Sequence, residues 1–247
     1  MQPDCGGDAM ATYVISDIHG QYDMFMDLLE KISLRDSDTL YILGDILDRG
    51  PHPLKTLRKL MLMPNVICIV GNHELMALES LKFLMKEVTT ENIKKLDPEM
   101  LDGFLVWLEH NGGRTTMDEF KALSREEQNE VIGYLREFLV YEETEVAGKD
   151  YLLVHAGLGG FDPEKDIEDY SLKELVWDHA DYETPYYEDR FVVTGHTPTQ
   201  YIPGARPGYI YRKNNHIAID CGAHINGGRL AAICLDTGKE FYSFSHK

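Results

Sequence analysis

The sequence predicts an α/β fold, and three observations support this prediction. Strand-like and helix-like patterns alternate from Thr12 to about Leu81. Short apolar runs dominate again after Tyr151. Clusters rich in Asp, Asn, His and Gly follow directly after most of these apolar runs. Such an alternation implies parallel strands joined by helices, and the ligands of such sheets gather at the carboxyl ends of the strands.

The first elements follow in order from their residue patterns. Three short β-rich runs predict parallel strands at residues 12–16, 40–43 and 66–70. Apolar residues at helical spacing predict a helix after each strand. They are Phe25, Leu28, Leu29 and Ile32 after the first, Leu54, Leu57 and Leu60 after the second, and Leu75, Leu78 and Leu81 after the third. Pro53 suits the first turn of the second of these helices.

Residues from about 76 to 140 are rich in Leu, Met, Glu and Lys and mostly helical in period, with a turn at Asn111-Gly112-Gly113. We interpret them as a helical insertion and not as a separate domain. Strands are then expected at residues 151–154, 191–194, 217–219, 230–235 and 241–244, with an acidic loop at 159–190. The chain 1–247 is therefore expected to form a single domain, with residues 1–10 as a polar leader.

Composition limits the class of protein. The net charge is −18, from 24 basic and 42 acidic residues, so bulk nucleic acid is not expected as a partner because phosphate backbones need a basic face. No apolar run reaches the ~20 residues of a membrane helix, so no membrane association is expected. Four scattered cysteines lack CxxC spacing, which favours a cytoplasmic location. The oligomeric state stays open.

The polar clusters carry ligands that suit divalent metals. Asp17 and His19 alternate along the backbone, so their side chains leave on the same face and can bind one metal. Asp45 follows the second strand and can bridge two metals. Three more ligands follow further strands: Asn72, His155 and His196. Each residue alone has a structural alternative, a turn carboxylate or a satisfied histidine, but the combination favours a metal site.

Three neighbouring residues suit phosphate chemistry. His73 can protonate a leaving group, and Asp48 can orient its imidazole and hold it protonated. Arg49 offers a planar donor fork that matches two phosphoryl oxygens. Structural alternatives stay open here: Asp48 as a turn or cap residue, Arg49 as a surface charge, and Glu74 as a first-turn acid favoured by the helix dipole.

Two further groups receive no direct role. Asp220-Cys221-Gly222 is expected to serve the turn and packing beneath the site. Six histidines are not expected to be metal ligands: His52, His110, His179, His216, His224 and His246.

In this order the clusters resemble the signature of the PPP family of phosphoprotein phosphatases, within the calcineurin-like metallophosphoesterase superfamily. The matching motifs are Asp17-x-His19-Gly20, Gly44-Asp45-x-x-Asp48-Arg49-Gly50, Gly71-Asn72-His73-Glu74, His155-Ala156-Gly157 and Gly195-His196. The resemblance runs from about Tyr13 to the C-terminus. The modest length and Asn111-Gly112-Gly113 look more like the bacterial and phage serine/threonine phosphatases than the longer eukaryotic enzymes.

The resemblance implies a four-layer αββα sandwich with two divalent metals at one edge, Mn²⁺ by expectation and Fe or Zn as alternatives. It implies that a hydroxide bridging the metals is the nucleophile, with His73 as general acid, Asp48 as its orienting partner and Arg49 as a phosphate clamp. In this family pattern one metal is bound by Asp17 and His19. The other metal is bound by Asn72, His155 and His196, and Asp45 bridges the two.

One departure from the family pattern concerns phosphate binding. Bacterial relatives commonly carry a second phosphate-binding arginine just after a tryptophan, whereas this sequence reads Val176-Trp177-Asp178-His179. Either His179 takes that role, or one of three arginines reaches in from a loop: Arg190, Arg206 or Arg212.

The main functional prediction is a metal-dependent phosphomonoester hydrolase, a serine/threonine protein phosphatase acting on phosphorylated protein or a small phosphate ester. The alternative is a symmetrical dinucleoside polyphosphate hydrolase, because diadenosine tetraphosphatases carry similar motifs. Six tyrosines in the second half of the chain keep this alternative open: Tyr182, Tyr186, Tyr187, Tyr201, Tyr209 and Tyr211. A non-enzymatic protein that keeps the fold is disfavoured, because every expected ligand and His73 are present.

Overall fold

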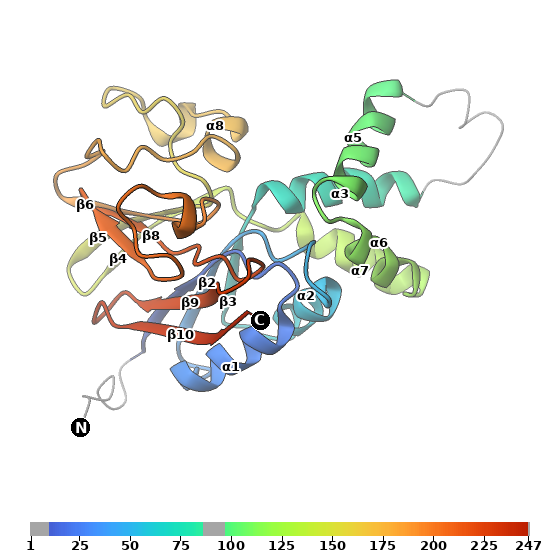
Figure 1. Ribbon diagram of the computed structural model, residues 1–247, viewed down its shortest axis with the longest axis horizontal. Helices are drawn as coiled ribbons and strands as arrows, with labels where there is room; N and C mark the ends of the chain where they lie inside the picture. The colour runs from blue at the N-terminus through green and yellow to red at the C-terminus, as the bar shows by residue number, and fades with distance from the viewer. Residues whose placement is uncertain (1–9, 86–96, 247) are drawn as a thin grey trace.

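Two five-stranded sheets pack face to face between helices and loops in the computed structural model, which describes residues 10–85 and 97–246 (Figure 1). The strand orders are β10-β9-β1-β2-β3 in the first sheet and β4-β5-β6-β8-β7 in the second. This arrangement confirms the predicted α/β class and the four-layer sandwich. Most of the expected polar leader and residues 86–96 of the expected insertion lie outside the described residues.

The first sheet comprises β1 (Thr12–Ile15), β2 (Thr39–Leu43), β3 (Val66–Ile69), β9 (Arg229–Cys234) and β10 (Glu240–Ser245). The second comprises β4 (Tyr141–Val146), β5 (Lys149–Val154), β6 (Arg190–Thr194), β7 (Tyr211–Lys213) and β8 (His216–Ala218). In the first sheet β1, β2 and β3 are parallel, and β9 and β10 pair antiparallel. In the second sheet β5, β6 and β8 are parallel, and β4 and β7 pair antiparallel.

All the expected strands are present, but two further strands were not predicted. β4 pairs with β5 as a hairpin. Its sequence, Tyr-Glu-Glu-Thr-Glu-Val, does not indicate a strand, because it is rich in charge and only its last residue is buried. β7 has three residues and contributes only an edge. Strands with so little buried apolar surface give no clear alternation in the sequence.

Alternation of side chains along the strands builds the layers. In β1, Ile15 packs in a core cluster with Phe25 of the helix layer, whereas Val14 packs in a second cluster between the sheets with Val193 of β6. On the far side of the second sheet, Leu152 of β5 belongs to a third cluster. One strand thus contributes to two cores, which requires apolar residues at consecutive positions.

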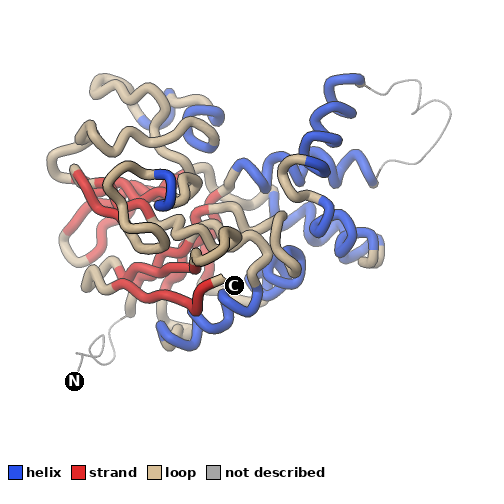
Figure 2. Tube along the Cα trace, in the orientation of Figure 1, coloured by secondary structure: helices blue, strands red, loops and turns tan. Residues whose placement is uncertain are grey.

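The helices are α1 (Tyr22–Ile32), α2 (Pro53–Met61), α3 (Asn72–Leu84), α5 (Pro98–Glu109), α6 (Arg114–Lys121), α7 (Arg125–Leu135) and α8 (Leu172–Val176), with 3₁₀ turns at Ile167–Asp169 and Thr199–Tyr201. Figure 1 shows α5, α6 and α7 with the end of α3 as a lobe beside the sheets. Loops cover much of the second sheet, with α8 among them (Figure 2).

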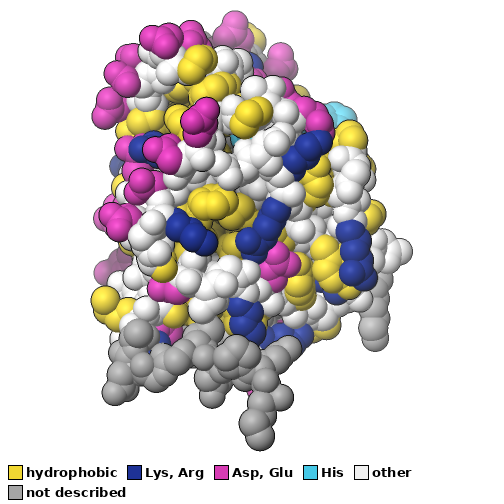
Figure 3. Space-filling view, turned by 90° about the vertical axis from the view of Figure 1, so that its left-hand side faces the viewer, with side chains coloured by type: hydrophobic (Ala, Val, Ile, Leu, Met, Phe, Trp, Pro, Cys, Tyr) yellow, Lys and Arg dark blue, Asp and Glu magenta, His cyan; other side chains and the backbone are white. Residues whose placement is uncertain are grey.

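Charge is unevenly distributed on the surface. Figure 3 shows Asp and Glu side chains gathered toward the top of one face, with separate Lys and Arg side chains across its middle. None of the helices in the described ranges is long and apolar enough to cross a membrane. Three described cysteines are buried thiols: Cys68, Cys221 and Cys234.

Candidate active site

The polar clusters lie together because each follows the carboxyl end of a parallel strand. Asp17, Asp45 and Asn72 come directly after β1, β2 and β3 of the first sheet. His155 and His196 come after β5 and β6 of the second. The backbone N–H of His196 donates to both carboxylate oxygens of Asp17 at 3.2 and 3.0 Å, across 179 positions of sequence.

One group of candidate ligands surrounds Asp45 on the side of the first sheet. The Nδ1–H of His19 donates to the carbonyl oxygen of Leu47 at 2.9 Å, which fixes the tautomer and leaves Nε2 free to bind a cation. This Nε2 lies 3.6 Å from Asp45 Oδ2, and Nε2 of His73 lies 3.9 Å from the same oxygen. The three ligand atoms are within 4.8 Å of one another.

The two histidines of the second sheet are also fixed by carbonyl oxygens. The Nδ1–H of His155 donates to the oxygen of Leu43 at 2.6 Å, and the Nε2–H of His196 donates to the oxygen of Trp177 at 3.1 Å. Each imidazole therefore turns its other, unprotonated nitrogen into the site. This is the usual arrangement of histidines that bind a metal.

These unprotonated nitrogens lie close to side-chain oxygens of Asn72 and Asp45, which carry no proton either. The side-chain oxygen of Asn72 is 3.1 Å from His155 Nε2 and 3.1 Å from His196 Nδ1. Asp45 Oδ1 is 3.4 Å from the same His155 nitrogen. Four lone-pair atoms at such separations fit a divalent cation, whose ligands lie about 2.0–2.2 Å from it. The donor set therefore fits a metal.

Asp17 lies beside these groups but belongs to neither of them. Burial, followed by the charges of Asp220 and Asp45, raises the pKa of the Asp17 carboxyl well above its usual value. Burial likewise raises the pKa of Asp220 to about 7. A bound cation would relieve this crowding of buried carboxylates, which is consistent with the expected ligand role of Asp17.

The pKa shifts separate His73 from the other three imidazoles. Burial lowers the pKa of His19 and of His155, and it lowers the pKa of His196 to about 3, so all three imidazoles are neutral at pH 7, the form that can bind a cation. Burial also opposes the charge on His73, but Asp45 and Asp48 outweigh it and raise its pKa. His73 is thus the imidazole best suited to carry a proton.

Asp48 holds His73 and is itself held by the lobe of helices. Its Oδ2 accepts from His73 Nδ1 at 2.8 Å and from the indole N–H of Trp107 at 2.7 Å. Its Oδ1 accepts from the hydroxyl of Thr116 at 2.6 Å, and that hydroxyl accepts from the Asp48 N–H at 3.0 Å. Trp107 lies on α5 and Thr116 on α6, so these two helices hold Asp48 in place beside His73.

Arg49 points into the site from the loop after β2. Its Nη1 is 2.9 Å from Nε2 of His19 and 2.9 Å from Nε2 of His224, and its Nη2 is 2.9 Å from Nε2 of His73. Its backbone N–H donates to the carbonyl oxygen of Gly112 at 3.0 Å. The guanidinium therefore lies at the ligand groups, where its donor fork can reach phosphoryl oxygens.

Glu74 organises the loop that carries Asp45. Its carboxylate accepts from the backbone N–H groups of Asp45, Ile46, Leu47 and Gly71 at 2.7, 2.9, 3.2 and 3.0 Å. Burial and the charge of Asp45 raise its pKa to about 7. The interpretation of Glu74 as a first-turn acid alone was therefore incomplete, because its side chain reaches back over the β2 loop.

The backbone of the site is strained at its functional residues. Positive φ angles of 45 to 68° occur at Asp17, His19, Asp45, Asp48, Arg49 and His196. A non-glycine residue in this region costs of order 1–2 kcal/mol, and such strain clusters at functional sites. Two glycines make room for the carboxylates, because an added Cβ would lie 2.2 Å from Asp45 Oδ1 at Gly71 and 2.2 Å from Asp17 Oδ2 at Gly195.

The candidate for the second phosphate clamp also lies at the site. His179 Nδ1 is 2.7 Å from the Thr197 hydroxyl, and its ring centroid is 5.0 Å from that of His196. The alternatives are engaged elsewhere. Arg190 begins β6 and pairs with Glu143 of β4. Arg212 pairs with Glu240, and Arg206 lies over the ring of Tyr209.

Four residues with contacts at the site were not predicted to act there: Glu74, Trp107, Thr116 and His224. Trp107 and Thr116 contact Asp48 from 59 and 68 positions away. The only sequence signal near them is Asn111-Gly112-Gly113, whose Gly113 leaves no room for a Cβ against the Trp107 ring. His224 follows Asp220-Cys221-Gly222, which was assigned to the turn beneath the site.

Comparison with known proteins agrees with this geometry. The sequence profile described as calcineurin-like phosphoesterase matches residues 10–226. The chain is 30% identical over 252 residues to the asymmetrical bis(5′-nucleosyl)-tetraphosphatase PrpE of Halalkalibacterium halodurans, covering 89% of this chain and 88% of that protein. It is 40% identical over 107 residues to a symmetrical bis(5′-nucleosyl)-tetraphosphatase of Dechloromonas aromatica, covering 41% of this chain and 38% of that protein.

One solved structure is similar over almost the whole chain. It is described as "Crystal structure of a putative diadenosine tetraphosphatase" and superposes with a TM-score of 0.64 at 18% identity, covering 98% of this chain and 96% of that one. At this identity the likeness concerns the fold alone.

Proposed function

We propose, from the premise that this chain belongs to the calcineurin-like phosphoesterase family, that it hydrolyses dinucleoside polyphosphates. The observation that carries this substrate class is the 30% identity to a bis(5′-nucleosyl)-tetraphosphatase over 89% of the chain. This reverses the order of the two functions expected from the motifs, where a serine/threonine protein phosphatase came first. Both functions use the same hydrolytic site, so the residue roles are common to them.

The donor set suits two divalent cations, with Mn²⁺ as the expected metal and Fe or Zn as alternatives. We assign Asp17 and His19 to the first cation. We assign Asn72, His155 and His196 to the second cation, and Asp45 to both. When bound, such cations activate water as a nucleophile and polarise phosphoryl oxygens. Their identity and number are part of the proposal.

The remaining steps belong to the side chains of this chain. Arg49 donates hydrogen bonds to phosphoryl oxygens and offsets the charge that develops on them. His73 gives its proton to the leaving oxygen as the bond from phosphorus to that oxygen breaks. Asp48 keeps the His73 ring in place and stabilises its protonated form.

One observation favours phosphomonoester hydrolysis as a second activity. The His73–Asp48 dyad is buried and held by Trp107 and Thr116, an arrangement that supports a role as proton donor. A nucleoside diphosphate is a weakly basic leaving group, whereas a serine alkoxide is strongly basic and needs a general acid. A protein phosphatase of serine and threonine is therefore the second candidate.

A side-by-side assay separates these functions. Metal-stripped protein with Mn²⁺ restored is given diadenosine tetraphosphate or a phosphothreonine peptide. We expect a higher kcat/KM for the dinucleotide, with two ADP as products of symmetrical cleavage or ATP and AMP of asymmetrical cleavage. A higher kcat/KM for the peptide moves the protein to the second candidate. Absence of metal-dependent turnover on either substrate contradicts both.

Three broader expectations stay predictions. They are the single-domain organisation of residues 1–247 with the helical insertion at about 76–140, the cytoplasmic location, and the lack of nucleic-acid and membrane partners.

A further inference from the structure

A second concavity lies at the same sheet edge as the candidate active site. β10 and β1 both pair antiparallel with β9, so they run in the same direction. The residues that end β10 therefore arrive at the edge where Asp17 and His19 follow β1. A pocket of about 620 Å³ opens there, with a lining that includes Gln21, Tyr22, Asp23, His52, Phe244 and His246.

The pocket adjoins the loop that carries Arg49. Pro51 and His52 line it and follow Arg49 by two and three residues, a span of at most about 11 Å. On the other side, His224 contacts Arg49 at 2.9 Å, and its ring lies 4.7 Å from that of His19.

The end of β10 is anchored next to His224. Its His246 is tied by backbone hydrogen bonds to Gly227 and Gly228, at 3.0 and 2.7 Å, three and four residues after His224. The pocket therefore lies between the loop that carries Arg49 and the end of β10, on the side of the site where His224 contacts Arg49.

The lining has the chemistry that a nucleoside requires. The side chain of Phe244 is 49% exposed and offers an aromatic face on which a base can stack. The Gln21 amide has a donor and an acceptor for a base edge, and the Asp23 carboxylate can accept from ribose hydroxyls. The volume falls within the range of small-molecule sites, about 300–1,000 Å³.

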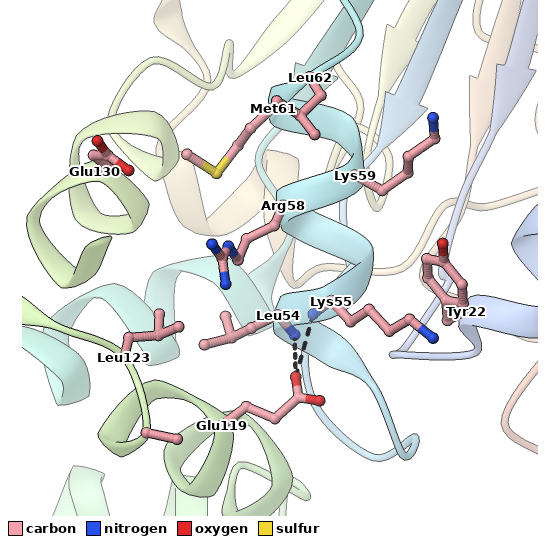
Figure 4. Close-up of a pocket in the computed structure, with 11 residues that line it drawn as sticks. Tyr22, Leu54, Lys55, Arg58, Lys59, Met61, Leu62, Glu119, Leu123 and Glu130 are labelled. Carbon is pink, nitrogen blue, oxygen red and sulfur yellow. Dashed lines mark hydrogen bonds between the residues drawn. The ribbon is translucent and has the colours of Figure 1, made fainter. Parts of the chain in front are cut away.

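A cavity of similar size elsewhere in the molecule is a poorer match. It measures about 590 Å³ and lies among α2, α6 and α7, where Figure 4 shows Leu54 and Leu123 near the Arg58 side chain. Arg58 already pairs with Glu127 at 2.8 Å, and Glu119 accepts from the backbone N–H groups of Leu54 and Lys55. None of these residues adjoins a strand end of the active site.

We propose that the pocket at Phe244 is a nucleoside subsite, which receives one nucleoside of a dinucleoside polyphosphate while Arg49 binds its phosphates. This rests on the proposed function and adds to it the side of the active site on which the substrate lies. The subsite discriminates nucleotides from phosphate esters that lack a base.

The test compares two inhibitors of p-nitrophenyl phosphate hydrolysis by the Mn²⁺-loaded enzyme. ADP and pyrophosphate share two phosphoryl groups, but only ADP carries a nucleoside. In the unmodified protein we expect a lower inhibition constant for ADP. Phe244→Ala should raise the constant for ADP about tenfold, as for the loss of one base-stacking contact. It should leave the constant for pyrophosphate and the KM for p-nitrophenyl phosphate unchanged.

Two further variants serve as controls. Phe244→Trp keeps an aromatic face and should retain the preference for ADP. Leu62→Ala removes an exposed apolar side chain from the cavity of Figure 4 and should change neither constant.

Three outcomes overturn the proposal: equal inhibition by ADP and pyrophosphate in the unmodified protein, an equal loss of both in Phe244→Ala, or a selective loss of ADP in Leu62→Ala. Failure of the proposed function is a separate result. If the enzyme does not cleave diadenosine tetraphosphate but Phe244→Ala still selectively weakens ADP, the subsite stands and the dinucleotide hydrolase does not.

Discussion

The two sides of the candidate active site are held in different ways. On the acid side, Asp48 and His73 are fully buried, and Asp48 takes hydrogen bonds from two side chains of the helical lobe, Trp107 and Thr116. On the ligand side of the second sheet, His155 and His196 are oriented by backbone carbonyl oxygens, and His196 is partly exposed.

This difference has a consequence for mutagenesis. A carbonyl oxygen cannot be removed by substitution, so the ligand side is open to mutation only at the ligands and at the side chains that touch them. The acid side depends on side chains that can be changed one at a time. Metal binding and proton donation should therefore be separable, with Asp45 as the residue on which both depend.

The largest effect is expected where the two sides meet. Asp45 lies 3.4 Å from His155, 3.6 Å from His19 and 3.9 Å from His73. Asp45→Asn removes the charge of the proposed bridging ligand, so we expect loss of bound Mn²⁺ and a fall in turnover of at least about 10³-fold, since metal activation contributes several kcal/mol. Elemental analysis and p-nitrophenyl phosphate turnover measure the two effects.

A matched control for this variant is Asp181→Asn. Asp181 is exposed, and its hydrogen bonds join it to Glu183 and Thr184 of its own loop and to the Tyr186 hydroxyl. Metal content and turnover should therefore not change. Full metal occupancy in Asp45→Asn would refute the bridging role.

The next effect concerns the acid side alone. His73→Asn should keep the metal content and lower turnover of a phosphothreonine peptide by about 10²–10⁴-fold, the usual contribution of a general acid. With p-nitrophenyl phosphate the loss should be much smaller, because its leaving group needs no proton. An equal loss with both substrates, or a loss of metal, would show that His73 is a ligand and not the acid.

A smaller loss of turnover is expected for Trp107, which donates its hydrogen bond to Asp48 and not to His73. Trp107→Phe keeps a large ring in the lobe but removes the indole N–H that binds Asp48 at 2.7 Å. A hydrogen bond to a charged group contributes about 1.5–3 kcal/mol, so peptide turnover should fall about 10- to 100-fold with metal content unchanged. As with His73→Asn, p-nitrophenyl phosphate turnover should change much less.

Phe104→Leu serves as the control for Trp107→Phe. The Phe104 ring lies 6.1 Å from that of Trp107 and has no contact with the N–H bond. This variant should lower thermal stability without changing the dependence on leaving group. If it produces the same dependence, packing of the lobe, and not the hydrogen bond, positions Asp48.

The sequence was most informative where chemistry and position coincide. Asp17, Asp45 and Asn72 were predicted because ligand side chains follow strand-like runs, and parallel strands bring their ends together. β1 and β2 were predicted for a related reason. Each is buried on both faces, so its sequence is a continuous apolar run.

The sequence was least informative where a local explanation was already sufficient. Glu74 suits a first helical turn, and nothing nearby indicates that its carboxylate reaches three residues of the β2 loop. Trp107 reads as an apolar residue of an amphipathic helix, because its bond to Asp48 is a tertiary contact that leaves no periodic trace. Such contacts become visible only when the lobe is placed against the sheet.

The smallest effect tests the ligand side of the comparison. His179 touches the site only through Thr197 and the ring of His196. If it binds substrate phosphate, His179→Ala should raise KM about 2- to 10-fold, the value of one ordinary hydrogen bond, with kcat unchanged.

Arg190→Ala is the matched comparison, because Arg190 pairs with Glu143 at the opposite end of β6 and should leave KM alone. A rise in KM for Arg190→Ala but not for His179→Ala would assign the second clamp to the arginine. A fall in kcat and in metal content for His179→Ala would instead mean that its ring supports His196, and then side chains hold both sides of the site.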